Sequence, residues 1–66
     1  SLLSATIVAE NATMADALAT YCMVLGLEKS QAFLKENPQY EALLIYDNNG
    51  ATESWSTSGL KVEDFR

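Results

Sequence analysis

Histidine is absent from this chain, and cysteine occurs once, at Cys22. Without histidine the chain has no imidazole for acid–base catalysis and lacks the ligand type used in most zinc sites. A single cysteine cannot form an intrachain disulfide. A reactive thiolate needs a nearby cation or base, and the nearest basic residue in the sequence is Lys29. We therefore interpret Cys22 as a small buried apolar residue.

Basic residues are scarce, since the chain has four Lys and Arg against nine Asp and Glu and a formal net charge of −5. Binding to nucleic-acid phosphates requires clustered basic side chains. The sequence therefore excludes a nucleic-acid partner. No apolar stretch approaches the ~20 residues that a membrane-spanning helix needs.

The chain has 66 residues, of which 48% are hydrophobic. A chain of this size forms at most one small domain and buries only about 60% of the surface that it exposes when unfolded. Its apolar content is high for so small a body, and exposed apolar patches mark interaction surfaces. We therefore interpret the chain as a C-terminal fragment of a longer protein, and we expect the isolated fragment to self-associate.

Local signals in the first half predict a strand followed by a helix. Alternation and β-branched residues predict the strand over residues 4–9. The run rich in Ala, Leu and Met predicts the helix over residues 13–25, capped at its N-terminus by Asn11 or Thr13. Gly26 is expected to end this helix, because glycine adopts the left-handed conformation at little cost.

The second half predicts another helix and a β-hairpin. The helix covers residues 28–36 and ends before Pro38, because the residue preceding a proline disfavours helical geometry. Strands are expected over residues 41–46 and 51–56. Between them, Asn49 and Gly50 favour a type I′ turn.

The order strand, helix, helix, strand, strand predicts an α+β fold in which helices cover one face of a sheet. Residues 1–66 would form a single small unit, with a charged tail over residues 61–66. The pairing of the hairpin is the best determined part of the sheet.

Asp16 and Thr20 are the candidate metal ligands of this chain. Residues four apart on a helix lie one above the other on the same face. The spacing therefore holds a carboxylate and a hydroxyl together on a backbone of small and apolar side chains. Oxygen donors suit Mg²⁺, which keeps waters or substrate phosphates in its other positions, and Mn²⁺ suits a similar site.

Two segments, Ala9-Glu-Asn-Ala-Thr-Met-Ala-Asp-Ala-Leu-Ala-Thr20 and Val24-Leu-Gly-Leu-Glu-Lys29, resemble the C-terminal signature of the ApbE family. These proteins are FAD:protein FMN transferases, formerly called thiamine biosynthesis lipoproteins. In the family a strand leads into the Asp- and Thr-bearing helix, a Leu-Gly-x-Glu-Lys turn opens a second helix, and a hairpin follows. The resemblance covers residues 4–60.

The resemblance implies that Asp16 and Thr20 hold the Mg²⁺ that sits on the FAD pyrophosphate. It further implies transfer of FMN from FAD to a Thr or Ser of an acceptor flavoprotein subunit of a redox complex, with release of AMP. The bacterial parent would be a periplasmic or membrane-anchored lipoprotein. No catalytic residue is assigned within this segment, and the residues that grip FAD are expected in the rest of the parent chain.

Other interpretations of these residues stay open at this point. Asp16 is also an ordinary acid early in a helix, where the helix dipole favours it, and the Thr20 hydroxyl can bond back to the carbonyl four residues earlier. Aromatic residues Tyr40, Tyr46 and Trp55 can stack on a flavin ring, although such residues on strands more often serve packing. The alternative functions are an FAD pyrophosphatase of the same family and a non-enzymatic α+β module that binds a protein partner.

Overall fold

In chain order, a computed structural model of the protein, which describes residues 1–57, contains a strand, two helices and two strands. The elements are β1 (Leu2–Val8), α1 (Ala12–Leu25), α2 (Leu27–Glu36), β2 (Glu41–Asn48) and β3 (Ala51–Ser56). The order and type of all five predicted elements are confirmed, and no predicted bound differs from the observed one by more than two residues. The predicted tail over residues 61–66 lies outside the described residues.

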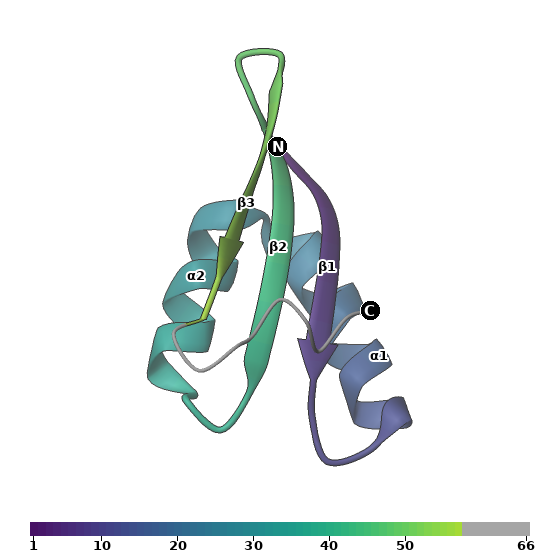
Figure 1. The fold of residues 1–66 in the computed structure, drawn as a ribbon. Helices are drawn as coiled ribbons and strands as arrows, with labels where there is room; N and C mark the ends of the chain where they lie inside the picture. The colour runs from purple at the N-terminus through teal and green to yellow at the C-terminus, as the bar shows by residue number, and fades with distance from the viewer. Residues whose placement is uncertain (58–66) are drawn as a thin grey trace.

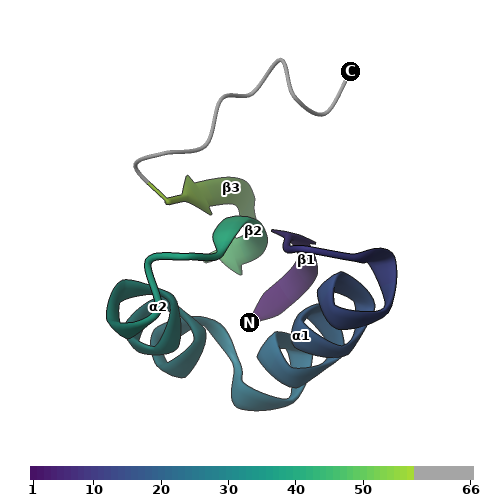
Figure 2. The same ribbon diagram turned by 90° about the horizontal axis from the view of Figure 1, so that it is seen from below.

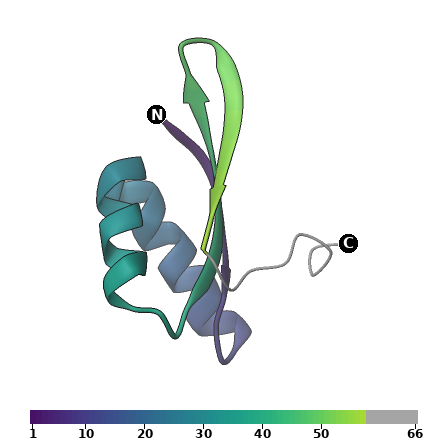
Figure 3. The ribbon, with the colours of Figure 1, turned by 60° about the vertical axis from the view of Figure 1, so that its left-hand side comes forward.

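The three strands form one antiparallel sheet in the order β1-β2-β3, so β2 is the central strand. Leu44 in β2 is opposite Ala5 in β1 and Trp55 in β3. Both helices lie against the same face of this sheet (Figures 1 and 3). The α+β prediction is therefore confirmed, and the first strand does join the sheet of the hairpin.

Asn11 and Gly26 set the limits of α1. The side chain of Asn11 accepts a hydrogen bond of 2.8 Å from the backbone N–H of Met14, so Asn11 is the N-cap. Thr13, the other candidate cap, lies inside the helix, where its own backbone is already helical. Gly26 has φ +85° and donates its N–H to the Cys22 carbonyl at 3.0 Å, while its own carbonyl accepts the N–H of Ser30. One glycine thus ends α1 and starts α2.

The core lies between the helices and the sheet. Its buried hydrophobic residues are Ile7, Cys22, Leu34, Ala42 and Leu44. Ser30 is also completely buried, and its hydroxyl donates a hydrogen bond of 2.9 Å to the Cys22 carbonyl. This bond fixes α2 against α1 and satisfies a polar group that would be costly to bury alone. The prediction that Cys22 is a buried apolar residue is confirmed. None of the helices among residues 1–57 has the length and apolar character to cross a membrane.

The hairpin turns at Asn49 and Gly50, whose φ angles are +53° and +89°. A type I′ turn requires positive φ at both central residues, so the predicted turn type is consistent with the structure. Next to the turn, Tyr46 and Asn48 of β2 donate hydrogen bonds across the hairpin to the Glu53 carboxylate of β3, at 3.3 and 3.2 Å. Desolvation, together with this carboxylate, raises the pKa of Tyr46.

Candidate metal site

Asp16 and Thr20 both lie on α1, and both side chains are exposed. Cys22, which follows Thr20 by two residues, points into the core. Positions two apart on a helix lie on nearly opposite sides. Thr20 therefore faces away from the sheet, and Asp16, one turn earlier, is beside it on the outer surface.

The Thr20 hydroxyl donates a hydrogen bond of 3.0 Å to the backbone carbonyl of Asp16. The back-bonded conformation considered for Thr20 is therefore present. A hydroxyl has one hydrogen to donate and two lone pairs that can accept. Because the hydrogen is directed at the helix backbone, the lone pairs of the Thr20 oxygen remain free for a cation on the outer surface.

The donor set of this site is incomplete within the described residues. Residues 1–57 contain no group of three or more His, Cys, Asp or Glu side chains placed to hold a metal ion. Asp16 and Thr20 supply one anionic and one neutral oxygen, which fits Mg²⁺ with several waters or phosphate oxygens in its shell.

Of the three aromatic residues considered for flavin stacking, Tyr40 and Trp55 pack within the unit, while Tyr46 bonds to Glu53 on the hairpin. Tyr40 stacks on Phe33 with ring centroids 6.3 Å apart, and Phe33 meets Tyr21 edge-on at 5.3 Å. Tyr40 and Trp55 both pack against the core. These contacts favour the packing role for Tyr40 and Trp55.

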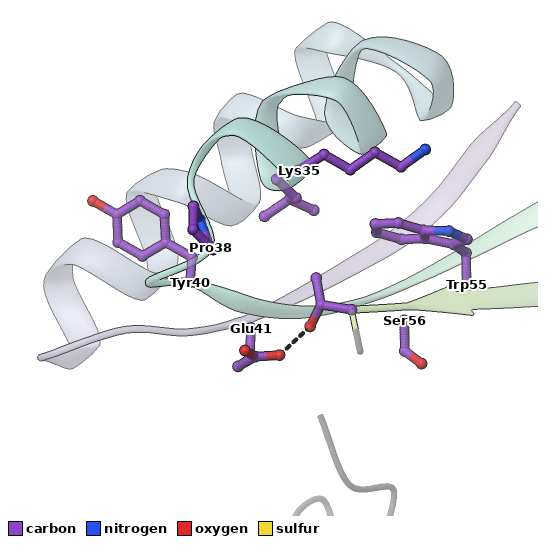
Figure 4. Close-up of a pocket in the computed structure, with 8 residues that line it drawn as sticks. Lys35, Pro38, Tyr40, Glu41, Trp55 and Ser56 are labelled. Carbon is purple, nitrogen blue, oxygen red and sulfur yellow. Dashed lines mark hydrogen bonds between the residues drawn. The ribbon is translucent and has the colours of Figure 1, made fainter. Parts of the chain in front are cut away.

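Sequence reasoning missed a pocket of about 410 Å³ between α2 and the hairpin. Trp55 and Tyr40 flank it, with Lys35 and Pro38 from α2 and the turn after it (Figure 4). Thr57 and Glu41 also line it, and the Thr57 hydroxyl accepts the N–H of Ala42 and donates to the Glu41 carboxylate. The pocket adjoins α2 and β3, whereas the outer face of α1 carries Asp16 and Thr20, so it is separate from the candidate metal site.

The comparison with known families gives a match over residues 1–44, which include the whole of β1, α1 and α2. The matching family is described as the ApbE family. The chain belongs to the ApbE family. The family resemblance seen in the sequence is thus confirmed over residues 4–44, a segment that contains both Asp16 and Thr20.

One relative of this ApbE chain is a protein of Treponema pallidum (strain Nichols) named FAD:protein FMN transferase. The two are 56% identical over 43 residues, which are 65% of this chain and 12% of that protein. The chain therefore corresponds to a small part of the length of the relative. No solved structure matches the chain.

Proposed function

We propose that this chain is the C-terminal part of a Mg²⁺-dependent FAD:protein FMN transferase and that it supplies two of the metal ligands. Membership of the ApbE family and the name of the Treponema relative support the reaction. The observation that carries the metal assignment is the exposed pair of oxygen donors, Asp16 and Thr20, one turn apart on α1.

Each ligand has a distinct part in the proposed site. The Asp16 carboxylate contributes the negative charge that attracts a divalent cation, and Thr20 contributes a neutral oxygen whose lone pairs are oriented by its bond to the Asp16 carbonyl. When bound, Mg²⁺ offsets the negative charge of the FAD pyrophosphate and of the departing AMP. The rigid helix holds both oxygens at one place on the surface against which the pyrophosphate must lie.

In the proposed reaction, an acceptor hydroxyl oxygen bonds to the phosphorus on the FMN side of the pyrophosphate. The bond from that phosphorus to the AMP oxygen breaks, and AMP carries away the electron pair. The hydroxyl proton passes to a base that we place in the rest of the parent protein. The acceptor would be a flavoprotein subunit of a redox complex. The parent protein would be a bacterial lipoprotein that is periplasmic or anchored on the outer face of a membrane.

The test uses the complete protein that carries this segment, with FAD, Mg²⁺ and an acceptor domain. Covalent flavin on the acceptor, detected by in-gel fluorescence and accompanied by an equal amount of AMP, is the expected result. Release of free FMN and AMP with no labelled acceptor would mean a pyrophosphatase. Absence of any FAD cleavage, or a gene that encodes only about the length of this chain, would favour the non-enzymatic module and contradict the proposal.

A further inference from the structure

The two helices of this unit differ sharply in polarity. In α1, with the sequence Ala-Thr-Met-Ala-Asp-Ala-Leu-Ala-Thr-Tyr-Cys-Met-Val-Leu, Asp16 is the single charged residue, and apolar side chains occur on every side. In α2, by contrast, charged residues occur at both ends and alternate with a clear apolar face. A helix that is apolar all round is typical of a protein interior, whereas an amphipathic helix is typical of a surface. The sheet covers only one side of α1, so apolar side chains on its other side stay uncovered.

The exposed large hydrophobic side chains are also concentrated in one part of the unit. Within residues 1–57 they all belong to β1 or α1, namely Leu3, Val8, Met14, Tyr21, Met23 and Val24. Val24 is 81% exposed, which is the largest value among them. Figure 2 shows β1 and α1 together on one side of the unit, with α2 on the other side. The uncovered apolar surface is thus confined to the β1–α1 side.

The free edge of β1 strengthens this asymmetry. In the described sheet β1 pairs only with β2, so alternate backbone groups of β1 point away from any partner strand. The strand reads Leu-Leu-Ser-Ala-Thr-Ile-Val, with no charge, proline or glycine. Natural proteins protect an edge strand with charged residues, proline or a β-bulge, or cover it. The register of β1 shifts between Leu2 and Ser4, at the start of the strand. From Ser4 to Val8 the edge has no such protection among the described residues, so we expect a cover there.

We infer that the outer face of α1 and the free edge of β1 form the surface on which the remainder of the ApbE polypeptide packs. This rests on the part of the proposed function that makes the chain one segment of a longer protein. The length of the Treponema relative indicates what covers this surface. The matched segment is only 12% of that protein, so the rest of it has no counterpart here. A unit of this size, with one sheet and one layer of helices, can bury neither the outer face of α1 nor the edge of β1 by itself.

The position of Asp16 follows from this packing. Once the outer face of α1 is covered, the one charge on that helix lies within or at the rim of the interface. Buried charges in proteins are paired or coordinate metals. The candidate metal site would therefore be completed across the interface, by groups from the remainder of the polypeptide.

The test compares two substitutions in the complete protein. Val24→Lys places a charge on the inferred interface, and Ala32→Lys makes the same kind of change at an exposed position on α2. Both positions are exposed in this unit, so interactions within the unit alone predict small and equal effects. We expect Val24→Lys to lower the melting temperature by at least about 3 °C, or to prevent folding, and Ala32→Lys to change it by less than about 1 °C. Ala17→Lys, on the same outer face one turn from Thr20, is expected to act like Val24→Lys.

Equal melting temperatures for Val24→Lys, Ala17→Lys and Ala32→Lys would overturn the inference. So would a complete protein that sediments as a dimer and becomes a monomer with Val24→Lys, because a second copy would then be the occupant. These readouts do not depend on the reaction. If the interface variants melt early while the wild type transfers no FMN, the interface stands and the proposed function fails. If FMN transfer occurs and the melting temperatures are equal, the proposed function stands and the inferred interface fails.

Discussion

Replacing Thr20 by Val in the complete protein separates metal binding from folding. Within residues 1–57 Thr20 is exposed, and its hydroxyl donates to the Asp16 carbonyl, which also accepts the helical N–H four residues later. That carbonyl therefore keeps a partner when the hydroxyl is removed. Valine keeps the branched shape and a similar helix propensity, so it also fits where the outer face of α1 is covered. The free energy of unfolding should therefore fall by less than about 1 kcal/mol.

The effect on Mg²⁺ affinity should be larger than the effect on stability. A water can replace the lost hydroxyl oxygen, and holding an ordered water costs up to about 2 kcal/mol. This corresponds to a loss of up to about 30-fold in affinity. The assay is acceptor labelling over a Mg²⁺ titration, in which the midpoint should move to higher Mg²⁺ while the plateau rate largely recovers. A Thr20→Val protein that is folded and has the wild-type midpoint would refute ligation by Thr20.

Three further predictions concern stability and the isolated chain. Ser30→Ala removes the buried bond to the Cys22 carbonyl, which keeps its bond from Gly26, so thermal or urea unfolding should show a loss of about 1 kcal/mol; an unchanged stability would argue against that bond. Gly50→Ala forces a side chain into the left-handed region at φ +89° and should cost about 1 kcal/mol, measurable in the same way, whereas a gain would contradict the turn geometry. The purified 66-residue chain should neither cleave FAD nor bind Mg²⁺ tightly, since two protein oxygens leave most of the shell to water, and robust FMN release in a chromatographic assay would contradict this.

Much of the fold could be predicted because a few Gly, Pro and Asn residues determine where its helices and strands end. Gly26 separates the two helices, and Pro38 follows the end of the second helix. Asn49 and Gly50 determine the hairpin turn. These residues act through their own backbone preferences, which are readable in one sequence. The choice between Asn11 and Thr13 as the cap was not readable, because both side chains can accept the bond and only the start of the helix decides between them.

Features that depend on tertiary contacts could not be predicted. The burial of Ser30 reflects the close approach of α1 and α2, and a serine in a helix gives no sign of it. The contact between Thr57 and Glu41 depends on the register of β2 and β3. For the candidate metal site, the spacing predicts that Asp16 and Thr20 share one face of a helix, and the structure places both on the exposed side of α1. Their role as ligands comes from the family resemblance and stays a prediction. Sequence reasoning names no further ligand, because the groups that would complete such a site depend on tertiary contacts.

Asp16→Ala in the complete protein tests the central claim most directly, with Glu28→Ala as the matched control. Both acids are exposed on helices of this unit, but only Asp16 belongs to the candidate metal site. We expect Asp16→Ala to remain folded, to lose most of its Mg²⁺ affinity in calorimetric titration and to label the acceptor barely at all, while Glu28→Ala behaves like the wild type. A folded Asp16→Ala protein that binds Mg²⁺ and transfers FMN at the wild-type rate at low Mg²⁺ would contradict the account and leave Asp16 as an ordinary helix acid.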